Sequence, residues 1–417
     1  MQVSNESPKV DMSAIQEPTL PSLQSTLPNL TSDILSDKLL DRNVLSSSSS
    51  SISSALTSRS TMTKSQMLQK FGSSAESEKS VALALKWIAA HQLKKGGKAG
   101  AWSFNHSLAT PREDSSGEGD YVDSTNAATA LALLPFLGAG QTHLEGQYKA
   151  TVKSGLASLI SNMKVTTENG TPVGSWHETR GNMYSHGLAT ITVCEAYAMT
   201  HDPDLLQPAQ LALNYIIWFQ DQNGGGWRYQ PQQAGDTSVV GWCLMGLKSG
   251  RMGNLSVPNA TFIRANAFLD FVSTDNGAFY GYTGPRPDRN PAQTSIGLLC
   301  RMYLGWPKEH PGLRDGVAYL GSVGPRMDDL YYTYYATQVM RHFGGDNWDR
   351  WNAVTRDTVI KGQITTGVDA GSWDPQGHHS RAGGRLYQTA LATMILEVYY
   401  RHLPLYTDKT AEDEFEI

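Results

Sequence analysis

Cysteine is scarce in this chain. Of its 417 residues only three are cysteine, Cys194, Cys243 and Cys300, and each lies inside an apolar stretch. No two of them have a Cys-x-x-Cys spacing, so neither a disulfide framework nor a zinc site of that type is indicated. We expect all three to be small buried core residues, and we expect neither a metal ion nor another cofactor.

Basic patches and long apolar runs are lacking as well. Lys and Arg number 34 against 39 Asp and Glu, which gives a net charge of −5 and argues against a nucleic-acid partner. No stretch approaches the roughly 18 consecutive apolar residues of a membrane span, and the N-terminus has no basic segment followed by an apolar core. We therefore expect a cytoplasmic protein without a membrane span, and association with a membrane surface stays open.

The composition divides the chain into three parts. Residues 1–75 are rich in Ser, Thr, Asp and Pro and hold few large apolar residues, which predicts a disordered N-terminal arm. Residues 76–406 carry apolar residues at helical spacing. Residues 407–417 form an acidic tail.

A Gly-x-Trp unit recurs along the helical part, with one apolar helix before each copy and another after it. Successive central copies lie about 50 residues apart, the size of one helix-turn-helix repeat. The copies are Gly100-Ala101-Trp102, Gly174-Ser175-Trp176, Gly225-Gly226-Trp227 and Gly371-Ser372-Trp373, with an aromatic variant at Gly277-Ala278-Phe279. The helices make about six such units, and the fifth lacks its tryptophan.

Six helix pairs cannot bury their apolar faces singly. Stacking them until the last pair meets the first removes both exposed ends. The repeat therefore predicts an all-α (α/α)6 toroid of about six helix pairs, whose inner helices surround a central cavity. Glycine permits the tight turn, and we expect each tryptophan to pack on a neighbouring helix while its indole N–H finds a partner.

The stretch Gln222-Asn223-Gly224-Gly225-Gly226-Trp227 resembles the Gln-Trp repeat of squalene–hopene and oxidosqualene cyclases, which share the terpenoid cyclase toroid with prenyltransferases. The resemblance covers about four-fifths of the chain. It implies a single-ring, terpenoid cyclase-like isomerase or lyase. It also implies an isoprenoid or similar apolar ligand in the toroid cavity and cyclisation initiated by an acid.

The acid motif of that family is degenerate here. The family protonates its substrate with the middle Asp of Asp-x-Asp-Asp-Thr, whereas the comparable stretch has Gly235 in that place and retains only Asp236. We predict Asp236 and Asp123, each directly ahead of an inner helix, as the catalytic acids. Both also suit the N-cap of the helix that follows, and the two roles can coexist.

The other entrances to the inner helices are polar and aromatic. Aromatic rings can stabilise a carbocation, and they also pack against the flat apolar faces of polycyclic ligands or sugars. We predict as ligand-binding residues His186, Trp242, Gln293, Tyr332, Tyr334, Tyr387 and His378. His378 and its neighbour His379 lack a third ligand at metal spacing, so no metal site is predicted there.

Two further functions remain open. A non-catalytic toroid would bind a lipid or a protein partner, the latter through the N-terminal arm. A polysaccharide-acting (α/α)6 enzyme would use paired carboxylates, with Glu178 and either Asp123 or Asp236 as the pair. The missing acid pair favours the non-catalytic toroid, whereas the Gly-x-Trp units favour the cyclase interpretation over the polysaccharide-acting enzyme.

Overall fold

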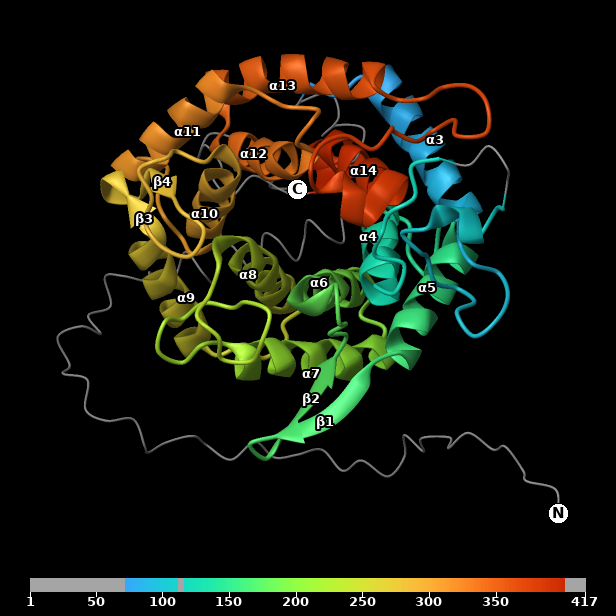
Figure 1. The fold of residues 1–417 in the computed structure, drawn as a ribbon, viewed down its shortest axis with the longest axis horizontal. Coiled ribbons are helices and arrows are strands. Elements are labelled where there is room, and N and C mark those ends of the chain that lie inside the picture. Colours follow the sequence, from blue (N-terminus) through green and yellow to red (C-terminus); the bar gives the residue numbers. More distant parts are fainter. Residues whose placement is uncertain (1–71, 112–115, 402–417) are drawn as a thin grey trace, which may run out of the picture. The chain divides into compact units, whose positions relative to one another are not determined.

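The computed structural model describes residues 72–111 and 116–401. Within these residues, twelve helices alternate between an outer and an inner ring (Figure 1). The outer helices are α3 (Ala75–Ala90), α5 (Lys149–Ser161), α7 (Pro203–Phe219), α9 (Asn259–Val272), α11 (Pro311–Val323) and α13 (Gly345–Lys361). The inner helices are α4 (Thr125–Gly138), α6 (Asn182–Thr200), α8 (Thr237–Met252), α10 (Pro291–Tyr303), α12 (Leu330–Phe343) and α14 (Ser380–Leu396).

Each inner helix packs against the next one along the chain, and α14 packs against α4, so the ring is closed. The predicted (α/α)6 toroid is confirmed. The shorter elements are η2 (His106–Leu108), the hairpin of β1 (Lys164–Glu168) and β2 (Thr171–Ser175), β3 (Ser273–Thr274), η3 (Asp275–Gly277), β4 (Phe279–Tyr280) and α15 (Val398–Arg401). The described residues exclude residues 1–71 of the predicted arm and the acidic tail at 407–417. The protein partner predicted for the arm therefore also lies outside them.

The inner and outer helices differ in how far they are buried. All 14 positions of α4 are buried, as are Leu330–His342 of α12, whereas α7 buries only one face. A helix that is apolar on all sides belongs inside a protein, and an amphipathic one at its surface. No helix in the described part of the chain is long and apolar enough to cross a membrane.

The tryptophans of the repeat end the outer helices. Each is fully buried, and its indole N–H donates to a carbonyl in the last turn of the preceding outer helix, where carbonyls have no partner within the helix. The pairs are Trp102 with Ile88 (2.7 Å), Trp176 with Leu159 (2.7 Å), Trp227 with Ile216 (2.7 Å) and Trp373 with Val359 (2.8 Å). The structural role predicted for these tryptophans is confirmed.

Three glycines of the repeat hold neighbouring outer helices together. Gly100, Gly225 and Gly371 have φ of 88°, 78° and 102°, a region that L side chains rarely adopt. A Cβ at these positions would lie 2.5 Å from the carbonyl oxygen of Ser154, 1.9 Å from that of Arg264 and 2.2 Å from that of Leu83, each in the next outer helix. Because Leu83 belongs to α3, the last contact joins the sixth helix pair to the first.

A glutamine completes the unit. Gln220 Nε2 donates to the carbonyl of Gly225 (2.8 Å) and to that of Thr261 in α9 (3.0 Å). Gln92 and Gln363 make the same pair of bonds to their own repeat glycine and to the carbonyls of Thr151 in α5 and Ser80 in α3. The sequence comparison placed this glutamine at Gln222, which is exposed and bonds only the carbonyl of Gln220 (2.9 Å).

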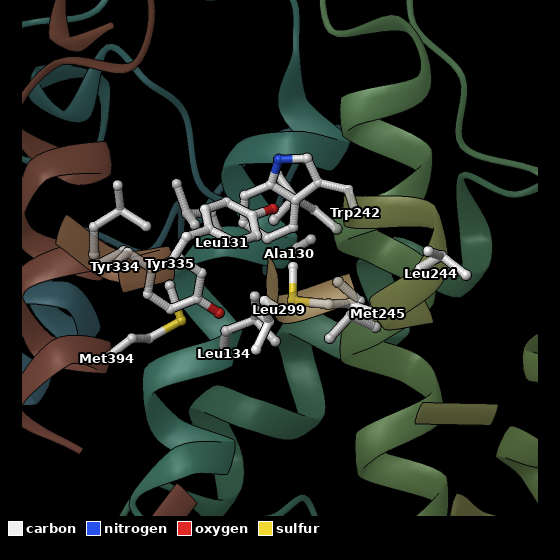
Figure 2. Close-up of a cluster of buried hydrophobic side chains, with 14 of the residues drawn as sticks. Ala130, Leu131, Leu134, Trp242, Leu244, Met245, Leu299, Tyr334, Tyr335 and Met394 are labelled. Atoms are coloured by element: carbon white, nitrogen blue, oxygen red, sulfur yellow. The ribbon is translucent and has the colours of Figure 1, made fainter. Parts of the chain in front are cut away.

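Side chains fill the centre of the ring (Figure 2). Trp242 and Tyr334 stack there with ring centroids 6.0 Å apart. The other members of this packed centre are Leu131, Leu134, Met245, Leu299, Tyr335 and Met394, and none of the eight exceeds 7% exposure. Side chains lining a chamber for an isoprenoid chain would be accessible to water-sized molecules. The eight side chains of the packed centre are closed to such molecules, so they do not line the central cavity that the sequence predicted.

Candidate functional site

The six inner helices begin at the same end of the ring, which we call the mouth. Two backbone hydrogen bonds join neighbouring segments at this end: Thr237 N–H donates to the carbonyl of Tyr282 ahead of α10 (2.9 Å), and Asp120 N–H, ahead of α4, donates to that of Arg381 (2.9 Å). Each helix start presents unpaired N–H groups and the positive end of the helix dipole. Carboxylates are stabilised at such a surface.

Asp236 is the N-cap of α8. Its Oδ1 accepts the N–H of Val239 (2.9 Å), and Arg228 Nε lies 3.6 Å from its Oδ2. The Asp236 side chain has no exposed surface, and this burial raises its pKa from 3.8 to about 6. The Val239 N–H, the Tyr282 hydroxyl and the Arg228 charge all oppose that rise. The structure thus supports the cap and also supplies a carboxyl that keeps its proton to an unusually high pH.

Four tyrosines surround this carboxyl, and we call them the tyrosine cluster: Tyr184, Tyr229, Tyr282 and Tyr331. The Tyr229 and Tyr282 hydroxyls lie 2.5 Å apart. Burial raises the pKa of Tyr184, and the nearby Tyr331 and Asp236 raise it further. Sequence analysis missed Tyr184, Tyr229 and Tyr282 as site residues, although each lies within ten residues of the start of an inner helix.

Glu178 provides a second carboxylate at the mouth. Its oxygens accept the N–H groups of Asn126 (2.9 Å) and Ala127 (3.3 Å) at the start of α4. Burial raises the pKa of Glu178, while the hydrogen bonds from α4 lower it. His177 Nε2 lies 3.1 Å from the carbonyl oxygen of Tyr229, which ties the loop of Glu178 to that of Asp236.

Asp123, the second predicted acid, is placed differently. Its side chain is 54% exposed, and one of its oxygens lies 3.8 Å from Arg180 Nε. The N-cap position of α4 is occupied by Ser124, and Glu178 satisfies the helix start instead. Asp123 is therefore neither the cap nor a buried acid.

Three of the predicted ligand-binding residues do lie at the mouth. Gln293, at the start of α10, donates from Nε2 to Ser238 Oγ (3.2 Å). Tyr387 is partly buried in α14 close to Tyr331 and Asp329, and burial together with these neighbours raises its pKa. His378 is exposed in the loop ahead of α14.

The other four predicted ligand-binding residues do not lie at the mouth. Trp242 and Tyr334 belong to the packed centre. The Tyr332 hydroxyl donates to the carbonyl of Gly324 (3.0 Å) on the side of the outer helices. His186 is fully buried between α6 and α7, where burial lowers its pKa to about 3.

His186 makes a structural hydrogen bond that recurs in other repeat units. Its Nδ1 accepts the backbone N–H of Trp176 (3.2 Å), as Thr129 and Thr389 accept those of Trp102 and Trp373. An alignment of the units would have shown His186 at the same position as these threonines. The described residues include no group of three His, Cys, Asp or Glu side chains placed to hold a metal ion.

The fold defines the class of protein as an (α/α)6 toroid, and comparisons with known proteins agree. An inactive variant of an α-1,6-mannanase of glycoside hydrolase family 76 from Salegentibacter sp. HEL1_6, in complex with α-1,6-mannotriose, is 11% identical with a TM-score of 0.52. The alignment covers 78% of this chain and 99% of that one. The family 76 mannosidase Bt3792 from Bacteroides thetaiotaomicron VPI-5482 is 12% identical with a TM-score of 0.52, over 78% and 98% of the two chains.

A type II terpene cyclase from Scytonema is 14% identical, and the alignment covers 78% of this chain and 97% of that one. Its TM-score of 0.46 is too low to support a functional argument. The sequence matches no described protein family, and no curated protein matches it.

The terpenoid cyclase interpretation is therefore wrong. Two toroids that resemble this one more closely are the family 76 mannanase and mannosidase, and the centre where an isoprenoid would bind is filled by Trp242, Tyr334 and their neighbours. The Gly-x-Trp unit led to that interpretation because it specifies how the ring is built. It carries no information about the ligand.

Proposed function

We propose that this protein cleaves glycosidic bonds in a polysaccharide or oligosaccharide bound at the mouth, with Asp236 as proton donor and Glu178 as the second carboxylate. One observation carries the proposal: the mouth holds two carboxyl groups, Glu178 on the start of α4 and the fully buried Asp236 on the start of α8, with the tyrosine cluster around Asp236. Aromatic rings and a few convergent polar groups are typical of a saccharide site.

Glycoside hydrolysis requires two carboxyl groups in different roles, and we assign one role to Asp236 and the other to Glu178. One carboxylic acid must hold a proton for the leaving oxygen, while a second carboxylate acts as base or nucleophile. Burial keeps Asp236 protonated to about pH 6. Two backbone N–H groups favour the ionised form of Glu178 and oppose the rise in its pKa that burial causes.

The structural relatives support this choice of chemistry. The α-1,6-mannanase from Salegentibacter sp. is inactivated by replacing two adjacent aspartates. This chain has one adjacent aspartate pair, Asp328 and Asp329. Asp329 lies at the mouth, where its Oδ1 accepts the N–H of Tyr332 (3.0 Å) at the start of α12. Asp329 is thus a further carboxylate to replace in the same assay.

The test is release of reducing ends from a panel of neutral and acidic polysaccharides by the purified full-length chain. We expect turnover of at least one substrate, and we expect Asp236→Asn and Glu178→Gln each to lower it by about 100-fold or more. Asp357→Asn, an exposed position on α13 paired with Arg356, is the matched control and should retain full activity. Cleavage that persists in Asp236→Asn, or no cleavage of any substrate, would contradict the proposal.

A further inference from the structure

Arg228 has an unusual environment for a partly buried arginine. Its side chain is 30% exposed, yet its Nε is buried and donates no hydrogen bond to any described residue. The guanidinium lies over the rings of Tyr229 and Tyr282, at 5.3 and 5.7 Å from their centroids. It is therefore held in place by aromatic faces at the mouth, with donors left unused.

Two buried arginines, Arg301 and Arg385, make the hydrogen bonds that Arg228 lacks. Arg301 donates to Asn266 Oδ1 (2.5 Å) and to the Tyr280 hydroxyl (3.1 Å). Arg385 donates to Asp374 Oδ1 (2.7 Å) and to Ser372 Oγ (3.2 Å). A buried donor without an acceptor destabilises the folded state, so an arrangement that leaves one at Arg228 requires an explanation.

Asp236 does not use these donors. The 3.6 Å between Arg228 Nε and Asp236 Oδ2 exceeds the length of a hydrogen bond. The hydrogen bond that this carboxyl does make runs to its own helix, from the N–H of Val239. Because Nε is buried and faces Asp236 while the side chain is 30% exposed, the two Nη groups of the guanidinium are the donors that can meet a group arriving from solvent.

We propose that Arg228 binds a carboxylate of the saccharide, so that the substrate is an acidic chain containing uronic acids and not a neutral one. This inference rests on the proposed function and narrows its substrate. A planar guanidinium with two free parallel N–H groups matches a carboxylate in a bidentate arrangement, and an aromatic platform orients it. The helix dipoles at the mouth favour an anion in the same place.

Binding of that carboxylate also acts on the acid. The positive charge of Arg228 lowers the pKa of Asp236 in the free protein. A substrate carboxylate paired with Arg228 neutralises that charge, so Asp236 holds its proton more firmly when a substrate is bound. An acidic saccharide would therefore promote the protonated state that donates to the glycosidic oxygen.

The experiment compares binding of tetragalacturonate, tetraguluronate and the neutral α-1,6-mannotetraose to the full-length chain by calorimetry. We expect an acidic oligosaccharide to bind more tightly than mannotetraose. In Arg228→Gln its affinity should fall by 10-fold or more, and Arg228→Lys should fall between Arg228→Gln and wild type, because a lysine keeps the charge without the fork. Arg381→Gln, at the mouth but already bonded to Asp120 (2.9 Å), is the matched control and should bind as wild type does.

Thermal unfolding of each variant verifies that it is folded. Tighter binding of mannotetraose, or undiminished binding of the acidic oligosaccharides by a folded Arg228→Gln, would overturn the inference and leave the proposed function standing. Failure of every saccharide to bind, together with no cleavage in the reducing-end assay, would overturn both.

Discussion

At the scale of single residues, Asp236 combines a structural and a chemical role. The same carboxyl that accepts the first N–H groups of α8 is cut off from solvent, and this burial makes it a weaker acid. The sequence predicted its position ahead of a helix, because a cap is a local feature. It did not predict the burial, since the covering groups come from Arg228 and from Tyr282 in the loop ahead of α10.

The raised pKa of Asp236 makes folding stability depend on pH. Because its folded-state pKa lies above the unfolded value, Asp236 contributes stability that is fully present below about pH 4 and is lost as pH rises through about 6. Asn keeps the cap but carries no charge. We expect the free energy of unfolding of Asp236→Asn, relative to wild type, to rise by about 3 kcal/mol between pH 3.5 and pH 8.

Urea unfolding of both proteins at the two pH values measures this difference. His186 and His342, whose pKa values are lowered by burial, change the stability of both proteins equally and cancel in the comparison. A difference that does not vary with pH would show that Asp236 is ionised as easily as a surface carboxylate.

At the scale of elements, the repeat unit acts as a joint between three helices. Its tryptophan ends one outer helix, its glycine touches the next outer helix, and its backbone N–H bonds the inner helix that follows. The Gly and Trp could be predicted because they keep a fixed spacing. The glutamine could not, since Gln220 precedes its glycine by five residues whereas Gln92 and Gln363 precede theirs by eight.

Gly371 makes the contact that closes the ring, and its replacement should show this. Gly371→Ala places a Cβ 2.2 Å from the carbonyl oxygen of Leu83 and strains a φ of 102°. Gly367→Ala has a φ of 76° but nothing within 4 Å of the new Cβ, so it strains the backbone alone. We expect a loss of about 1–2 kcal/mol for Gly367→Ala and at least about 2 kcal/mol more for Gly371→Ala.

Chemical denaturation of the two variants gives the comparison. Equal losses would mean that α13 and α3 separate without cost, and that the contact between Gly371 and Leu83 does not hold the ring closed.

At the scale of the whole molecule, the parallel inner helices give the ring two different ends. Their N-termini carry Asp236, Glu178 and Asp329, and basic residues such as Lys248 and Arg341 lie near the C-terminal ends of α8 and α12. The helix dipoles favour carboxylates at the first of these ends and cations at the second. This difference makes the mouth, where backbone N–H groups and tyrosines gather, the end suited to a polar ligand.

The sequence predicted the ring but not the position of the site within it. Trp242 and Tyr334 lie on inner helices that are buried on all sides, so helical periodicity does not show which of their faces meets a ligand. Tyr229 and Tyr282 come together across 53 residues, and nothing local in the sequence connects them. The resemblance in fold suggested a terpenoid cyclase, but only the residues of the site can establish a function.

The most direct test of the account is a crystal structure of the Asp236→Asn variant with a bound oligosaccharide. The account predicts density for the sugar at the mouth, with one ring against Tyr229 or Tyr282 and a glycosidic oxygen within hydrogen-bond distance of the substituted side chain. A ligand in the centre of the ring beside Trp242, or on the outer surface, would contradict it.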